Sequence, residues 1–303
     1  MRVLSAVLLA ATLTACSALS GLDDFSVADA GGAGPVSVTT TSTGGGGSAT
    51  SSTAGGGAGT TNQLTDEGLV ARYFLESLET CGPVDDDDDG FDCVRDAAPD
   101  PLPLRVARDD DAFPRWVDNP EGHLFWDEAG RSGGPIRGSV VGTKLADRLN
   151  GAVEATLEVV VLVDGATGMG SRLVHFGRDE SSGRLTLRTG SPSTMNLFVN
   201  DDIAASAPVP AGQRIVVHGV YPPVGAGSGR APRFYVDGSA VATTSIFDRG
   251  SIDLSDCHFA IGNRMGAGRS IHGRIYYAAV YAEALSDERI AAHAARLAES
   301  NDP

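Results

Sequence analysis

Short apolar runs bounded by Gly, Pro, Asp or Asn dominate the chain after residue 64. The runs that predict strands are residues 68–75, 155–164, 171–177, 184–190, 196–200, 213–221, 233–238, 258–264 and 272–282. Several of them alternate: Phe234 and Val236 point to one side of a strand, and Arg233 and Tyr235 point to the other. Many strands with almost no helical period predict an all-β, antiparallel two-sheet sandwich.

One short helix is predicted at the C-terminal end of this sandwich. Ser286 is placed as its N-cap, and two acidic residues follow in the first turn, where the helix dipole favours them. Ile290, Ala294 and Leu297 fall on one face, so the helix is expected to lie against the sandwich. We expect His293, on the same helix, to face solvent.

The first residues have the pattern of an export signal. Arg2 precedes an apolar run, residues 3–13, that is too short to cross a bilayer as a stable helix. The run ends in "LTAC", residues 13–16, which resembles the bacterial lipobox. That resemblance implies a signal peptide over residues 1–16 and a lipid on Cys16. Ser17 after it favours the outer membrane under the usual sorting rule of these lipoproteins. The alternative is an ordinary signal peptide with a chance cysteine.

A spacer separates this signal from the strand-rich part. Residues 26–63 contain no aromatic residue, and Asp29 is their only charge. Such a segment cannot bury enough apolar surface to offset the entropy of ordering, so residues 17–63 are predicted to be a disordered Gly/Ser/Thr tether. Residues 64–303 are predicted to form one domain that faces solvent, away from the membrane.

The charge of this domain excludes one class of partner. The chain carries −16, of which Arg2, Asp23, Asp24 and Asp29 account for −2, so residues 64–303 carry −14. An acidic domain repels phosphate backbones and anionic lipid headgroups. We therefore expect no nucleic-acid partner, and contact with the membrane through the lipid anchor only.

The last third of the chain resembles a known family. Residues 234–238 ("FYVDG"), 259–264 ("FAIGNR") and 272–290 look like the closing half of the LamG-like, concanavalin A-like jelly roll, and residues 68–75 resemble its opening strand. The matching positions at the end are Gly273, Tyr281, Ala284, Leu285, Ser286, Asp287 and Glu288. The resemblance covers most of residues 68–297. It implies two packed sheets and roles in binding glycans, cell surfaces or proteins, sometimes with calcium at the rim.

Two positions depart from the family pattern. Tyr276 and Tyr277 stand where the family often carries acidic residues, and the usual Trp-His opening is absent from residues 213–221. No binding residue is transferred from those positions.

The run "DDDDDG" is a candidate calcium loop. An EF-type loop places oxygen ligands at alternate positions, a glycine at the sharp turn and an acid at the end. In the one register that fits, the ligands are Asp85, Asp87, Asp89, the carbonyl of Phe91, and Asp96. Asp96 is shorter than the usual Glu, and convincing flanking helices are lacking. The alternatives are thus a calcium site, with Kd on the order of 10⁻⁴ to 10⁻³ M, and a solvated acidic insertion.

Cys81 and Cys93 bracket this run, and export permits disulfides. Joining them would close a short loop and contribute about 3 kcal/mol in the loop-entropy model. Loop proximity favours this pair, and a pairing of Cys257 with either of them stays open.

Catalytic patterns find little support. Glu154 and Glu158 lie on the same side of a strand, but the glycosidase pattern Glu-x-Asp-x-x-Glu is absent, so we interpret them as an outward polar face. Ser132 fits Gly-x-Ser-x-Gly without the strand–helix context that a nucleophile needs. Trp126 is expected in the core, with Phe125 pointing outward, whereas Trp116 is left open between core and sugar stacking.

The sequence therefore predicts a non-enzymatic, lipid-anchored surface module without catalytic residues. Glycan or matrix recognition is the first hypothesis, with calcium as the one cofactor left open. A protein-interaction or structural envelope domain is the alternative, and a concanavalin A-like glycosidase is a lower one.

Overall fold

The computed structural model describes residues 64–76, 78–81, 91–106, 114–117, 122–126, 134–165, 167–178, 183–191, 193–222, 231–245, 249–265 and 268–300. The predicted lipidation site, Cys16, the tether, Ser132 and the aspartates Asp85, Asp87 and Asp89 lie outside these residues.

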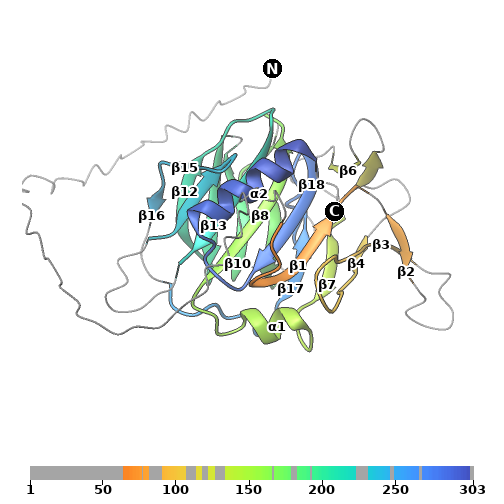
Figure 1. Ribbon diagram of the computed structural model, residues 1–303. Helices are drawn as coiled ribbons and strands as arrows, with labels where there is room; N and C mark the ends of the chain where they lie inside the picture. The colour runs from red at the N-terminus through yellow and green to blue at the C-terminus, as the bar shows by residue number, and fades with distance from the viewer. Residues whose placement is uncertain are drawn as a thin grey trace, which may run out of the picture. The chain divides into compact units, whose positions relative to one another are not determined.

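Two antiparallel sheets form the domain (Figure 1). Sheet A contains β1 (Leu69–Phe74), β5 (Arg115–Val117), β6 (His123–Trp126), β8 (Ala155–Val163), β13 (Arg214–Tyr221), β14 (Arg233–Val236), β15 (Ser239–Val241) and β18 (Gly273–Tyr281). Sheet B contains β2 (Glu79–Cys81), β3 (Phe91–Val94), β4 (Leu104–Val106), β7 (Ile136–Ser139), β9 (Arg172–Gly177), β10 (Leu185–Ser191), β11 (Thr194–Val199), β12 (Asp202–Pro208), β16 (Thr244–Ser245) and β17 (His258–Ile261). The predicted two-sheet jelly roll sandwich is confirmed.

The strand orders interleave distant parts of the chain. Sheet A runs β15-β14-β13-β8-β18-β6-β5, with β1 also paired to β18, and sheet B runs β16-β12-β11-β10-β9-β17-β7-β4-β3-β2. The helices are α1 (Lys144–Leu149) and α2 (Asp287–Glu299). No helix in the described part of the chain is both long and apolar enough to cross a membrane.

The core lies between the two sheets. From sheet A, alternate residues of β8 (Leu157, Val159 and Val161) point into it, and sheet B contributes Phe176 and Phe259, whose ring centroids are 4.5 Å apart. Such interdigitation is what holds two aligned sheets together.

Trp126 on β6 is fully buried in this core, and Phe125 beside it is partly exposed. Both orientations agree with the alternation in the sequence.

Helix α2 covers the outer face of sheet A, packing against β13 (Figure 1). Ile290, Ala294 and Leu297 form its buried face as predicted, and the backbone N–H of Arg289 donates to the Ser286 hydroxyl, which caps the helix. Because α2 covers one face of sheet A and the core covers the other, both faces are buried at β8, which explains its nearly continuous apolar sequence.

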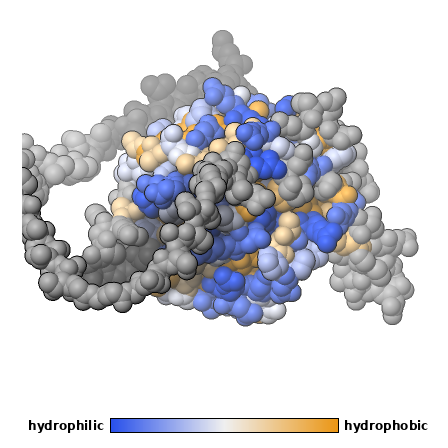
Figure 2. Space-filling model, viewed as in Figure 1, coloured by the Kyte–Doolittle hydropathy of each residue, from blue (hydrophilic) through white to orange (hydrophobic). Residues whose placement is uncertain are grey.

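On the side of the domain seen in Figure 2, hydrophilic residues are interspersed with apolar ones.

The predicted disulfide between Cys81 and Cys93 is confirmed, with Cα atoms 5.8 Å apart on the paired strands β2 and β3. Cys257 is free and buried, and burial raises the pKa of its thiol to about 11. The pairing that the sequence left open is thus resolved.

Two glycines with positive φ provide a test of the packing around Trp126. Gly262 has φ +79°, and a Cβ there would overlap the Trp126 ring, whereas Gly142 has φ +74° and open space around it. We expect Gly262→Ala to lower the free energy of unfolding in urea by about 3 kcal/mol or more, because it adds overpacking to backbone strain. Gly142→Ala is the control and should lose about 1 kcal/mol from the strain alone. Equal losses would contradict the packing described here.

Candidate functional site

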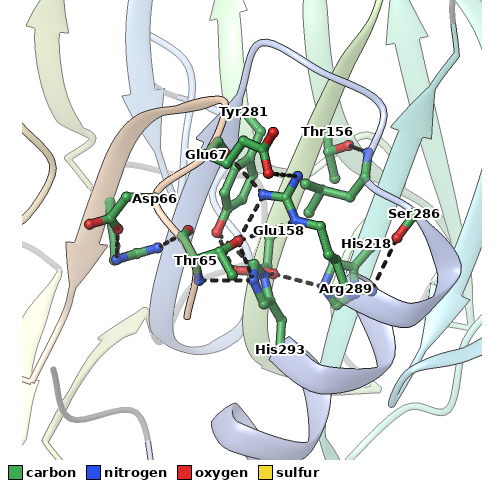
Figure 3. A network of polar contacts seen from close by, with 12 residues as sticks. Thr65, Asp66, Glu67, Thr156, Glu158, His218, Tyr281, Ser286, Arg289 and His293 are labelled. Carbon is green, nitrogen blue, oxygen red and sulfur yellow. Dashed lines mark hydrogen bonds and ion pairs between the residues drawn. The ribbon is translucent and has the colours of Figure 1, made fainter. Parts of the chain in front are cut away.

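A cluster of buried polar side chains lies between sheet A and α2 (Figure 3). Glu158 on β8 is fully buried, and its Oε2 lies 2.8 Å from Nε2 of His218 and 2.9 Å from Nδ1 of His293. His218 is adjacent because β13 pairs with β8 in a register that puts it opposite Glu158. His293 approaches from α2, so three elements meet at one carboxylate.

The hydrogen bonds define the proton positions in this cluster. The backbone N–H of Thr65 donates to Nε2 of His293 over 3.2 Å, which leaves Nδ1 of that ring to donate to Glu158. The Tyr281 hydroxyl donates to the other carboxylate oxygen over 3.3 Å. Burial alone would raise the pKa of Glu158, but the hydrogen bonds that His218 and His293 donate to it outweigh burial and hold this pKa below its ordinary value.

This cluster acts chiefly as a structural anchor. The three ligand atoms of Glu158, His218 and His293 lie within 4.8 Å of one another, a spacing that a metal ion could use. Each of these atoms, however, is already hydrogen-bonded inside a sealed site. The role that these hydrogen bonds support is therefore the attachment of α2 to sheet A.

Two sequence expectations are corrected here. Glu158 does point out of the sandwich, as predicted, but it is not on a solvated face, because α2 covers it. The expectation that His293 faces solvent is wrong, since it is fully buried. The signal was present in the helix: His293 is three residues after Ile290 and four before Leu297, so it shares their face.

The candidate glycosidase pair is not arranged for hydrolysis in this structure. Glu154 accepts a hydrogen bond from the backbone N–H of Ala284 over 3.2 Å, while Glu158 is sealed beneath α2. Two carboxylates that act on a sugar must flank an accessible glycosidic bond.

Asp96 also has a structural role. Its Oδ1 accepts from the backbone N–H groups of Arg72 and Ala98, each over 2.9 Å. Its Oδ2 accepts from Leu102 N and lies 2.6 Å from Nζ of Lys144. The predicted last ligand of the calcium loop thus already has four partners. The other side-chain ligands lie outside the described residues, so the calcium site stays a prediction.

The outer face of sheet B carries a second group of polar side chains, here called the polar face. Strand register places one row across β4, β7, β17, β9, β10 and β11: Arg105, Arg137, Ala260, His175, Thr186 and Phe198. A second row across β9, β10, β11 and β12 contains Arg172, Arg188, Asn196 and Ser206. Residues opposite each other on paired strands project from the same face, so both rows lie together.

Two contacts organise the polar face. The Arg188 guanidinium carbon lies 3.5 Å from the centroid of the Phe198 ring, a stacked cation–π arrangement. Nδ1 of His175 lies 2.9 Å from the Thr186 hydroxyl. Burial, followed by the charges of Arg172 and Arg264, lowers the pKa of His175 to about 3, so this imidazole is neutral at pH 7.

Helix packing distinguishes the two sheets. Among the described elements, α2 packs on β13 and α1 beside β1, and both strands belong to sheet A. On sheet B, Arg105 is exposed, and Arg137 and Arg188 are half-buried. Trp116, 36% exposed on the edge strand β5 of sheet A, donates from Nε1 to the Glu76 carbonyl over 2.6 Å. The accessible part of the polar face is therefore Arg105, Arg137 and Arg188, since His175, Thr186 and Asn196 are buried.

Comparison with protein families gives one match. A laminin G-type model, described as the concanavalin A-like lectin/glucanases superfamily, matches residues 139–291. No curated protein sequence matches the chain.

Solved structures with a similar fold include sialidases and a carbohydrate-binding module. The Trypanosoma rangeli sialidase in complex with the inhibitor DANA has a TM-score of 0.48 and 14% identity, over 76% of this chain and 33% of that one. The same sialidase with sialic acid has a TM-score of 0.46 and 16% identity, over 74% and 32%. The Ruminococcus gnavus IT-sialidase CBM40 bound to alpha2,3 sialyllactose has a TM-score of 0.39 and 14% identity, over 52% and 95%. The chain thus spans about a third of the sialidase chains.

One prediction from the sequence is wrong in the light of these comparisons. The protein was expected not to be an enzyme, but the matched family joins lectins with glucanases. Enzymatic activity is therefore not excluded by the fold.

The buried anchor can be tested by replacing Glu158 with glutamine (E158Q). Two imidazole N–H groups and the Tyr281 hydroxyl then share one acceptor oxygen, so the free energy of unfolding at pH 7 should fall by about 3 kcal/mol in urea denaturation. The control is E154Q, which changes a partly exposed carboxylate. It should stay within about 0.5 kcal/mol of the unmodified protein.

Comparing the stability of the unmodified protein and E158Q at different pH values tests the pKa of Glu158. Because this pKa is lower in the folded state, the ionised carboxylate stabilises the fold above the unfolded-state pKa of about 4.3. That contribution is lost as the pH falls further, toward the folded-state pKa. The stability difference between the unmodified protein and E158Q should thus be constant from about pH 7 to 5 and shrink below about pH 4. A difference that grows in acid would contradict the assignment.

Proposed function

The chain belongs to the concanavalin A-like lectin/glucanases superfamily, and from this membership we propose that it is a carbohydrate-binding domain held at the cell envelope. The family is defined by lectins and glucanases, both of which engage sugars. The polar face of sheet B is the proposed contact surface.

The observation that carries this proposal is the Arg188–Phe198 stack with Asn196 beside it. Register places Asn196 opposite Arg188, so a planar guanidinium and an amide lie next to each other. Sugars present hydroxyl groups for such donors and acceptors and C–H faces for flat side chains. Arg188 is half-buried, whereas Asn196 and Phe198 are buried, so a sugar would meet the guanidinium group first.

We also propose the placement of this domain in the cell. Acylation at Cys16 would hold the protein at the envelope, on the outer membrane, and residues 17–63 would act as a tether. A flexible chain of that length has a root-mean-square reach of roughly 35 Å. The binding face would then sample glycans beyond the headgroup layer, and calcium at the loop of Asp85, Asp87 and Asp89 would be an accessory.

Glycan binding is tested by an array of neutral and acidic glycans, with sialyllactose among them, probed with the full chain carrying C16S to keep it free of lipid. We expect saturable binding that N196A weakens about tenfold, because the amide contacts are lost. S239A, an exposed change on β15 of sheet A, is the control and should bind as the unmodified chain does.

Repeating the array in chelator tests the calcium accessory. Loss of binding would support a role for calcium in glycan binding. Unchanged binding would indicate that the aspartate run is a solvated insertion. Absence of binding to every glycan would contradict the proposed function and favour a protein partner, whereas cleavage of an arrayed glycan would identify a hydrolase.

Lipidation is tested by labelling cells with radioactive palmitate. We expect the chain to incorporate label and to fractionate with the outer membrane, and C16S to lose both properties because the acylated thiol is gone. C257S is the matched control and should remain labelled, since that thiol is buried in the domain. Label in C16S would contradict the assignment.

A further inference from the structure

The chain passes from sheet B to sheet A directly after β3. Val94, the last residue of β3, still pairs with β4 of sheet B. Two residues later, Asp96 forms a bridge to Tyr73 of β1 in sheet A, and the backbone N–H of Ala97 donates to the Arg72 carbonyl over 2.7 Å. One short segment thus joins the edges of the two sheets and closes a corner of the sandwich (Figure 1).

A pocket of about 390 Å³ opens at this corner. It lies between the end of β1 with the turn after it, the start of β2, and the segment that follows β3. The lining includes Phe74, Glu76, Glu79, Arg95, Ala98 and Pro101. This volume is near the lower limit for sites that hold small molecules, so there is room for one sugar residue rather than several.

The lining combines one aromatic ring with charged side chains. Phe74 is half-buried, and its ring centroid lies 5.2 Å from that of Tyr277, so a neighbouring ring holds it in place. Glu79 and Arg95 are exposed, and neither side chain forms a hydrogen bond or ion pair within the described residues. A flat apolar ring beside an unpaired acceptor and an unpaired donor suits a sugar, which presents a C–H face and hydroxyl groups.

Contacts outside the pocket hold its walls in place. The Cys81–Cys93 disulfide joins β2 to β3, and Nε1 of Trp116 donates to the carbonyl of Glu76. Behind the segment after β3, three backbone N–H groups and one lysine hold the carboxylate of Asp96. A pocket whose walls are set before binding loses less entropy when a ligand arrives.

Strand register connects this pocket with the polar face. Glu79 on β2 is opposite Cys93 on β3, which is itself opposite Arg105 on β4. Arg105 is in turn opposite Arg137 on β7. Since residues opposite each other project from the same face, this row of the polar face continues to the rim of the pocket. The row from Arg137 to Glu79 covers three strand spacings, or about 14 Å, and ends there because β2 is the edge strand of sheet B.

We propose that the corner pocket holds the terminal residue of a neutral glycan, and that the following sugar residues lie on the polar face. This inference rests on the proposed carbohydrate-binding function and specifies which part of the glycan is recognised. Two glutamates line the pocket against one arginine, in a domain with net charge −14. A terminal sugar that carries a carboxylate or a sulfate is therefore disfavoured by repulsion.

A second pocket, of about 500 Å³ beside the N-terminus of α2, is less suited to a sugar. Its charged groups are already used, since Arg233 pairs with Asp287 over 2.9 Å and the Tyr235 hydroxyl donates to the same carboxylate. The Ser286 hydroxyl caps the helix. None of the described residues that line this pocket is aromatic. Stacking and unpaired polar groups therefore occur together at the corner pocket.

The first test compares neutral and acidic chain ends on the glycan array. Each neutral glycan is paired with the same glycan carrying a terminal sialic acid or sulfate, with lactose and sialyllactose among the pairs. We expect the C16S chain to bind neutral ends, and the acidic cap to weaken binding at least about tenfold. Equal or tighter binding of the capped members would overturn the inference.

Two variants locate the binding in the pocket. E79A and R95A remove exposed side chains, so both proteins should unfold at the same urea concentration as the unmodified chain. In calorimetric titration with the neutral glycan that binds best on the array, we expect each variant to bind about tenfold more weakly, because hydrogen bonds to the sugar are lost. E299A, an exposed change at the end of α2, is the matched control and should bind as the unmodified chain does.

Tryptophan fluorescence reports the position of the bound glycan. The chain has two tryptophans, and Trp126 is buried in the core. Because Trp116 is hydrogen-bonded to Glu76 in the pocket wall, we expect the same neutral glycan to change the emission at saturation, and W116F to lose this change. Unchanged emission of the C16S chain at saturation would place the glycan elsewhere and overturn the inference.

The outcomes are distinguishable from those of the proposed function. Binding that N196A weakens but that E79A and R95A leave unchanged would overturn the pocket assignment and leave carbohydrate binding on the polar face intact. A blank glycan array would overturn both.

Discussion

The ionised carboxylate of Glu158 is the constraint on which the layering of this domain depends. A carboxylate removed from water loses several kcal/mol of hydration unless donors replace it. Here the donors are His218, His293 and Tyr281, which come from β13, α2 and β18. A shift of α2 by one turn would take His293 away and leave a buried charge, so the position of the helix on sheet A is specified by chemistry as well as by apolar packing.

Because this anchor holds α2 on sheet A, the outer faces of the two sheets have different surroundings. At β8, sheet A is buried on both faces, by the core on one side and by α2 on the other, and apolar contacts dominate there. Sheet B shares the core but keeps polar side chains, including two facing arginine pairs, on its outer side. The outer faces of the two sheets therefore differ in chemistry: α2 packs on one with apolar side chains, and polar side chains make up much of the other.

Local patterns in the sequence were sufficient for nine of the strands, the Ser286 cap, the burial of Trp126 and the Cys81–Cys93 disulfide, because each depends on neighbours close in the chain. They were insufficient for the site. That Glu158 points out of the sandwich follows from alternation, but that a helix 135 residues later covers it depends on tertiary packing. Asp96 fitted a calcium loop by spacing alone, and its actual donors include the backbone of Arg72, a strand earlier in the chain. The facing arginines depend on strand register between segments that the sequence separates, so no local window reveals them.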